Sequence, residues 1–508
     1  MLAVQDNIQT HRAGRREWLG LAVLMLPVLL ISVDNTVLSF AIPSLSQALA
    51  PSGTELLWIV DIYALILAGL LVPMGALGDR IGRRRLLLLG SAGFGLVSAA
   101  AAFVPSAGAL IGARALLGLF GAMLMPATLS LIRNIFTVPS QRRIAIAVWA
   151  AGFSGGAALG PIVGGVLLEH FWWGSVFLLS VPVLIPLLIF GPSLLPESRD
   201  PNPGPVDLLS VVLVMAAMFP VVFGIKAIAT SGLGAGSLVP IAVGVVFGAL
   251  FVRRQLRRLH PMLDVRLFRN PAFSGSISAN LLGVFSMVGF IFFFSQHLQL
   301  VLERSPREAG LIMLPGLALT VFSGLAVVRL VRYVRPGYVV AGGLLLNAVG
   351  YSIILAAGHD IGIAALMAAF MILGLGVGAA ETISNDLILS SVPPTKAGAA
   401  SAISETAYEV GAVLGTAVLG SILTAGYRNG VVIPDGLAAA DAAAASETLG
   451  GAVEVARHLP EGQAMQLLES ARAAFDSGVS TTSLIGVVLM LATAVGALIS
   501  LRGATADK

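Results

Sequence analysis

The amino-acid sequence predicts an all-α, polytopic membrane protein, and three observations support this prediction. Of the 508 residues, 57% are hydrophobic and 11% are charged, whereas soluble domains contain about 45–50% apolar and about 25% charged residues. The mean hydropathy is +0.94. Apolar segments of roughly twenty residues, the length that crosses a bilayer as a helix, recur along the chain and alternate with short polar stretches rich in arginine.

The first apolar segment runs from Trp18 to Phe40 and directly follows Arg12, Arg15 and Arg16. It is too long for the core of a signal peptide, which has about 7–15 residues, so we expect a retained first helix. Thirteen further segments bring the predicted number of transmembrane helices to fourteen. The expected spans are 18–42, 55–77, 85–104, 107–132, 143–168, 173–194, 207–228, 236–252, 273–301, 308–330, 337–357, 361–389, 397–425 and 479–501.

The basic residues give an independent check on this number, because short cytoplasmic loops are enriched in Lys and Arg. With fourteen helices, 23 of the 30 basic residues fall on one side, six on the other and only Arg114 within a span. We therefore expect a multi-pass protein of the bacterial cytoplasmic (inner) membrane with both termini in the cytoplasm. Orientation explains the net charge of +4, so no nucleic-acid partner is expected.

The segment 75–87 joins two spans and holds four arginines within six residues. Its glycines let helix ends approach, and its aspartate can accept hydrogen bonds from arginines. The spacing resembles the signature of the loop between helices 2 and 3 of the major facilitator superfamily; the alternative is a generic basic loop. The resemblance implies the major facilitator fold and a cytoplasmic latch built from Gly75, Asp79, Arg80, Gly82 and Arg83.

A faint internal repeat indicates how the chain is organised. Residues 324–332 align with residues 75–83, so that Arg329 matches Arg80 and Arg332 matches Arg83. Transporters are often built from such repeats around a central site. We expect an N-terminal six-helix half at 1–200, two inserted helices and a linker at 201–270, and a C-terminal six-helix half at 271–508. The polar, Ala-rich loop 426–478 of this half is expected on the exterior. It is either a solvated cap or a segment whose acidic residues attract cationic substrates.

Acidic residues inside spans point to function, because each costs about 2.5–3.5 kcal/mol at the bilayer centre. Asp34 and Asp61 lie at comparable depth in the outer halves of the first two helices. We expect both to take part in proton and substrate coupling. The alternative for each is a structural acid that is hydrogen-bonded in a polar pocket.

Glu405 and Glu409 are four residues apart in the thirteenth span and therefore share one helix face. Two carboxylates so close are costly when both are ionised, so one of them can hold a proton near neutral pH. A carboxylate that alternates between a proton and an organic cation is what proton-coupled export requires. Glu381 and Asp386 lie in the preceding span, where a structural role is an equal alternative.

Arg114 lies in the fourth span, in a sequence that resembles the helix 4 signature of proton-driven facilitators. A buried guanidinium needs a carboxylate or several carbonyl groups. Polar groups of the first helix, Asp34 among them, are the expected partners. The resemblance implies a role in proton relay, and purely structural pairing is the alternative.

Small residues recur at four-residue spacing in the fifth span and permit close packing of another helix, while a proline there permits a bend. The pattern resembles the antiporter signature of the same superfamily, which implies export; a generic packing face is the alternative. The residues that carry it are Gly156, Gly160, Pro161, Gly164 and Gly165.

Aromatic side chains are the expected lining for planar or quaternary cations, which bind to ring faces. Individually, each ring can equally well pack in the interior or face lipid. The candidates are Trp58, Tyr63, Trp149, Phe153, Phe290 and Tyr408. The histidines show no metal-binding spacing, and His297 is only a weak candidate.

Several stretches, including those around Asp34, Asp61 and 305–314, resemble the fourteen-helix drug:proton antiporters, and more closely their methyl viologen resistance pumps. This implies export of lipophilic mono- and dications: quaternary ammonium compounds, methyl viologen, acriflavine- and ethidium-type dyes and biguanides. We expect a monomer in the lipid bilayer, with protons and cationic small molecules as partners, and no cofactor or metal.

Two alternatives remain at this point. The first is an exporter of a native metabolite such as an amino acid or a siderophore. The second is a membrane-embedded enzyme or sensor, for which the sequence offers neither a catalytic Ser/His/Asp set nor a soluble signalling domain, so we expect no enzymatic activity.

Overall fold

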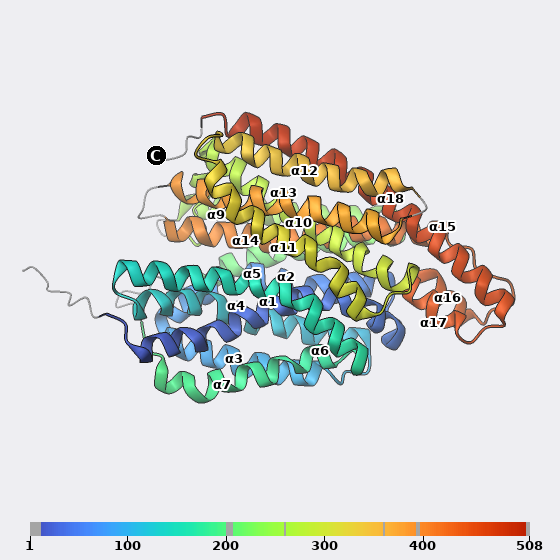
Figure 1. The fold of residues 1–508 in the computed structure, drawn as a ribbon, viewed down its shortest axis with the longest axis horizontal. Helices are drawn as coiled ribbons and strands as arrows, with labels where there is room; N and C mark the ends of the chain where they lie inside the picture. Colours follow the sequence, from blue (N-terminus) through green and yellow to red (C-terminus); the bar gives the residue numbers. More distant parts are fainter. Residues whose placement is uncertain (1–11, 200–206, 259–260, 359–360, 393–396, 504–508) are drawn as a thin grey trace, which may run out of the picture.

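The computed structural model describes residues 12–503 except for 200–206, 259–260, 359–360 and 393–396 (Figure 1). Within this part, the chain is helical and contains no strand. The helices are α1 (Arg15–Leu49), α2 (Gly53–Ile81), α3 (Arg83–Ala101), α4 (Ala107–Ile135), α5 (Pro139–His170), α6 (Ser175–Leu178), α7 (Ser180–Leu194), α8 (Leu208–Ser231), α9 (Ala235–Arg257), α10 (Pro271–Gln296), α11 (Pro306–Leu330), α12 (Pro336–Ala357), α13 (Ile363–Ser390), α14 (Ala397–Gly415), α15 (Ser421–Gly430), α16 (Ala439–Glu447), α17 (Leu449–Ala456) and α18 (Glu461–Ser500).

Local sequence explains several helix boundaries. Ser52 caps α2 and Ser305 caps α11, each through a capping box with a glutamate three residues later. Gly82 separates α2 from α3 with φ of 111°, a conformation that residues with a Cβ rarely adopt. The helices α2 and α11 end at Ile81 and Leu330, which are equivalent positions in the internal repeat.

Twelve of the described helices are long and apolar enough to cross a membrane. The expected spans 85–104 and 143–168 correspond to α3 and α5, which are helical but are not among the twelve. The all-helical fold is therefore confirmed, and the count of fourteen spans remains a prediction.

The helices form two bundles that lie against each other along their length (Figure 1). The helices α1–α7 form one bundle, and α10–α15 with α18 form the other. The start of α1 and the end of α18 lie at the same end, which we call the inner end; α16 and α17 lie at the opposite, outer end.

The two bundles touch closely at the outer end. The Ser295 hydroxyl donates to the carbonyl of Ser39 at 2.7 Å, and a Cβ built on Gly165 of α5 would lie 2.7 Å from the Cα of Arg307 in α11. The structure is therefore closed at this end.

The segment 426–478 forms a cap over the closed outer end. It comprises the end of α15, the short helices α16 and α17, and the first turns of α18. Glu447 accepts a hydrogen bond from the backbone of Gly53 at the start of α2, at 3.0 Å, and it pairs with Arg428 at 3.4 Å. The cap thus connects the two bundles.

The helices α8 and α9 form an antiparallel pair that packs on α2 and α15. Asp207 caps α8 and binds Arg254 of α9 at 2.8 Å. Burial raises the pKa of Asp207, but hydrogen bonds from Arg254 and Ser210 outweigh this effect and lower it to about 2.

Candidate functional site

Asp34 and Arg114 form a buried ion pair between α1 and α4. Arg114 Nη1 lies 2.7 Å from Asp34 Oδ2, and the two side chains are 2% and 7% exposed. The guanidinium also donates to the carbonyl of Ile59 at 3.3 Å and lies over the ring of Tyr63, 4.5 Å from its centroid. The expected partnership of Arg114 with Asp34 is therefore observed.

Asp61 has a partner that the sequence analysis missed. Lys226 Nζ of α8 lies 2.9 Å from Asp61 Oδ2, and both side chains are essentially inaccessible, at 0% and 1% exposure. The expectation that Arg114 is the only basic residue within a span is therefore wrong, because Lys226 lies inside α8 and already lay inside the expected span 207–228. The lone lysine near the end of an apolar segment was the available signal.

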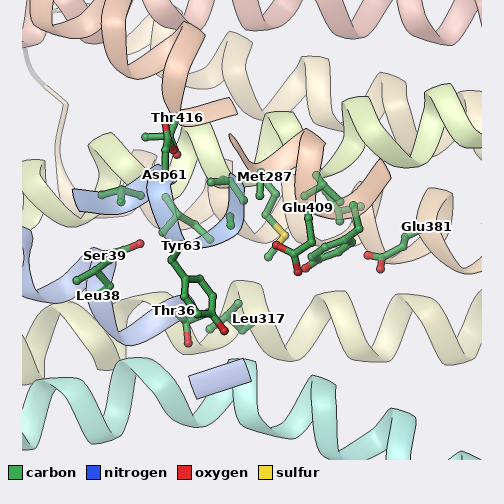
Figure 2. Close-up of a pocket in the computed structure, with 18 of the residues that line it drawn as sticks. Thr36, Leu38, Ser39, Asp61, Tyr63, Met287, Leu317, Glu381, Glu409 and Thr416 are labelled. Carbon is green, nitrogen blue, oxygen red and sulfur yellow. The ribbon is translucent and has the colours of Figure 1, made fainter. Parts of the chain in front are cut away.

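Two cavities lie between the bundles, and Glu409 lines both of them. The central cavity has a volume of about 120 Å³ and is also lined by Asp61 and Glu381. The inner cavity, of about 390 Å³, is lined by Glu405 and reaches Asp79 near the inner end. Figure 2 shows Asp61 beside Thr416 at one side of the central cavity and Glu381 at the other, with Glu409 between them.

Helix geometry explains why these acids are staggered. Asp61 is eight residues from the outer start of α2, or about 12 Å along the helix. Glu405 is eight residues from the inner start of α14, and Glu409 is one turn further in. The carboxyl groups thus mark successive depths between the closed outer end and the inner cavity.

The candidate aromatic residues divide into two groups. Tyr63 and Tyr408 line the central cavity, and Trp149 lines the inner cavity and donates to Thr128 at 3.2 Å. Trp58 instead packs against α8, and Phe290 is fully buried in a cluster of rings with Phe370. The side chain of Phe153 lies outside the described residues.

The glycines of α5 place this helix directly against α1. A Cβ on Gly156 would lie 2.8 Å from the Cβ of Ser32, one on Gly160 would overlap Thr36, and one on Gly164 would lie 2.6 Å from Val37 Cγ2. Further along, the carbonyl of Pro161 faces Gly310 of α11 too closely for a Cβ there. The small residues of α5 therefore allow close packing against two neighbours, α1 of the same bundle and α11 of the C-terminal bundle.

Comparison with known proteins agrees with this architecture. Residues 24–416 match the family model described as "Major Facilitator Superfamily", which covers more than half of the chain.

The chain belongs to the Major Facilitator Superfamily.

Its similarity to named members of the superfamily extends over nearly the whole sequence. It is 57% identical over 491 residues to "Multidrug efflux pump LfrA" of Mycolicibacterium smegmatis, with 97% of each chain covered. It is 39% identical over 483 residues to "Methyl viologen resistance protein SmvA" of Salmonella typhimurium, covering 94% of this chain and 97% of that protein. It is 35% identical to the "Tetracenomycin C resistance and export protein" of Streptomyces glaucescens, covering 94% and 91%.

A solved major facilitator structure supports the fold. The structure of a bacterial homologue of the human lysosomal transporter Spinster aligns with a TM-score of 0.69 at 17% identity, covering 96% of this chain and 98% of that one. The chain is therefore a multi-pass member of a transporter superfamily, and the relatives named above are efflux and resistance proteins.

The superfamily loop signature lies at the inner end, where α2 turns into α3. Asp79 accepts a hydrogen bond from Arg83 Nε at 2.9 Å, whereas Arg80 is exposed. A further carboxylate, which the sequence analysis did not single out, completes the loop: Glu197, after α7, accepts from the backbone of Arg84 at 3.1 Å. It also lies 3.8 Å from the side chains of Arg84 and Arg85.

His297, the weak candidate, is buried near the outer end of this major facilitator fold. Its Nδ1 lies 3.1 Å from Asp476 and its Nε2 lies 3.0 Å from the carbonyl of Ile361. No group of three or more potential metal-binding side chains occurs in the described part of the chain.

Proposed function

We propose that this chain is a proton-coupled exporter of lipophilic cations in the bacterial cytoplasmic membrane. The observation that supports this most directly is the set of carboxyl groups along the two cavities between the bundles. Glu381, Glu405 and Glu409 line these cavities, together with the rings of Tyr63 and Tyr408. Carboxylates beside aromatic rings form a favourable environment for an organic cation.

Charge balance provides the coupling. A buried carboxylate is costly unless it carries a proton or faces a cation. A cation that enters the inner cavity can therefore release a proton from Glu409, which is 6% exposed and lies one turn from the more exposed Glu405. A proton that arrives later can release the cation. Because coupling is reciprocal, the proton must weaken cation binding by the same factor by which the cation weakens proton binding.

The buried pair of Asp34 and Arg114 is proposed to relay this change to the N-terminal bundle. Arg114 lines the central cavity and contacts Tyr63 there, while Asp34 lies behind it on α1. The glycine face of α5, packed on α1, would transmit movement of α1 to the contact with α11 at the outer end. The loop 75–87 would act as a latch at the inner end, with Asp79 bound to Arg83 in the present state.

The proposed substrates are mono- and dications such as methyl viologen, ethidium and quaternary ammonium compounds. The name of the Salmonella relative includes methyl viologen, which supports this class. We further propose a monomer with both termini in the cytoplasm, halves at 1–200 and 271–508, the inserted helices at 201–270 and an exterior cap at 426–478.

Transport by purified protein in liposomes tests the proposal. With a pH gradient imposed, we expect ethidium or methyl viologen to move against the proton flux and to stop moving when an uncoupler is added. Glu405→Gln, Glu409→Gln and Asp34→Asn should each abolish gradient-driven movement. Asp435→Asn is the matched control, because it neutralises an exposed acid in the cap. Cation movement that ignores the gradient would exclude proton coupling, and no movement of any cation would favour a metabolite exporter.

A further inference from the structure

The buried lysine of α8 sits in an arrangement that resembles a bound cation. Lys226 Nζ lies 2.9 Å from Asp61 and 3.9 Å from the ring centroid of Trp58, over its face. The ring of Phe219 stacks with that of Trp58, and the two ring centroids are 6.2 Å apart. A carboxylate and an aromatic face are the two elements that proteins use to bind ammonium ligands.

Asp61 lies between the central cavity and the helix α8. It lines the central cavity next to Thr416, and it contacts Lys226, which enters from α8 on the side of the inserted helices. Trp58 is one turn away from Asp61 on α2. A cation in the central cavity can therefore approach Asp61 without passing the lysine.

We propose that Asp61 and Trp58 form a second cation subsite, which Lys226 occupies in this conformation and which takes the second charge of a dicationic substrate when Lys226 withdraws. This inference rests on the proposed function, because it assigns a substrate class to the same cavity. The inserted helix α8 then acts as a specificity element: its ammonium group competes with the distal charge of a dication. A monocation, which needs one carboxylate only, does not engage the subsite.

The alternative is that Asp61 and Lys226 simply fasten α8 to α2. The two readings differ in what happens when the lysine charge is removed. In the fastening role, Lys226→Gln changes stability and affects all substrates alike. In the subsite role, it leaves Asp61 free for a dication and alters only the balance between dications and monocations.

Equilibrium binding to the purified full-length protein distinguishes the two readings. The probes are methyl viologen, which carries two charges, and 1-methyl-4-phenylpyridinium, which has a similar ring system and one charge. We expect Lys226→Gln to tighten methyl viologen binding about tenfold and to leave the monocation affinity unchanged, which also shows that the variant is folded. Adding Asp61→Asn should remove the gain, and Lys226→Arg, which keeps the cation, should show none.

Equal changes for both probes, or no gain for methyl viologen, would overturn the subsite. The double variant Asp61→Asn/Lys226→Gln contains no charge at this position, so it provides a comparison even if the single variant does not fold. If the single variant does not fold, the wild type is compared with the double variant. The wild type must then bind methyl viologen more tightly than the double variant does, while both bind the monocation equally. Equal methyl viologen affinities would refute the subsite. Failure of wild type to bind either probe would contradict the proposed function itself, and the subsite with it.

Discussion

Replacing Gly165 by alanine should open the outer end of the protein. The new Cβ would lie 2.7 Å from the Cα of Arg307 and 2.9 Å from the carbonyl oxygen of Pro306. Both are backbone atoms, which cannot rotate away as a flexible side chain can. Overpacking of this kind costs about 1–3 kcal/mol. Because the clash exists only where α5 touches α11, the equilibrium should shift by about 5- to 150-fold toward a state that is open at the outer end.

Cysteine labelling can measure this shift, because the chain contains no native cysteine. Ser39 lines the central cavity, and its carbonyl accepts a hydrogen bond across the two bundles from Ser295. A Ser39→Cys background therefore gives a single thiol that becomes accessible when the outer end opens. We expect Gly165→Ala to speed its reaction with a membrane-impermeant maleimide added outside intact cells.

Gly155→Ala is the matched control for this experiment. It lies in the same helix, and a Cβ there would have no atom within 4 Å. It therefore shares the helix-stabilising effect of alanine without the clash. If both variants label at the wild-type rate, or if Gly155→Ala labels as fast as Gly165→Ala, the α5–α11 contact is not what keeps the outer end closed.

Three further changes have defined outcomes. Asp34→Asn leaves the guanidinium of Arg114, 2% exposed, without its carboxylate, and we expect the free energy of unfolding to fall by about 3–5 kcal/mol. Denaturation in detergent should show that Asp34→Asn/Arg114→Gln recovers most of this loss; if the double variant is no more stable than the single one, the pair is not the cause. Glu405→Gln should abolish proton-driven ethidium transport in liposomes. Asp386→Asn, which neutralises an exposed acid nearer the inner end, should retain it. Equal losses in the two variants would mean that transport depends on the total charge near the inner end and not on the carboxyl group of the cavity. Asp207 has a pKa of about 2 in place of its ordinary 3.8, so its stabilising effect should be complete above pH 3.8 and disappear as the pH falls through 2. Melting temperatures of wild type and Asp207→Asn should therefore differ at pH 6 and converge only below pH 2, and a constant difference would refute this assignment.

The membrane class and the family of this protein could be predicted from the sequence because both depend on local patterns. Long apolar segments, arginine-rich loops and the spacings around Gly75 and Gly156 are read along one chain, without knowledge of what packs against them. The same applies to the acids of the site, since a carboxylate inside an apolar span is conspicuous wherever it points. Glu405 and Glu409 share a face because they are four residues apart, and both do line the inner cavity.

The partners of these residues were decided by tertiary structure. Lys226 is 165 positions from Asp61 in the sequence and was overlooked within the expected span 207–228, yet the packing of α8 on α2 brings their charges within 2.9 Å. Phe290 was a candidate for the cavity lining but points into a cluster of rings. Hydropathy determines that a helix crosses the membrane and roughly how deep each residue lies; the rotation of each helix and its neighbours depend on contacts between distant segments, which only the folded chain contains.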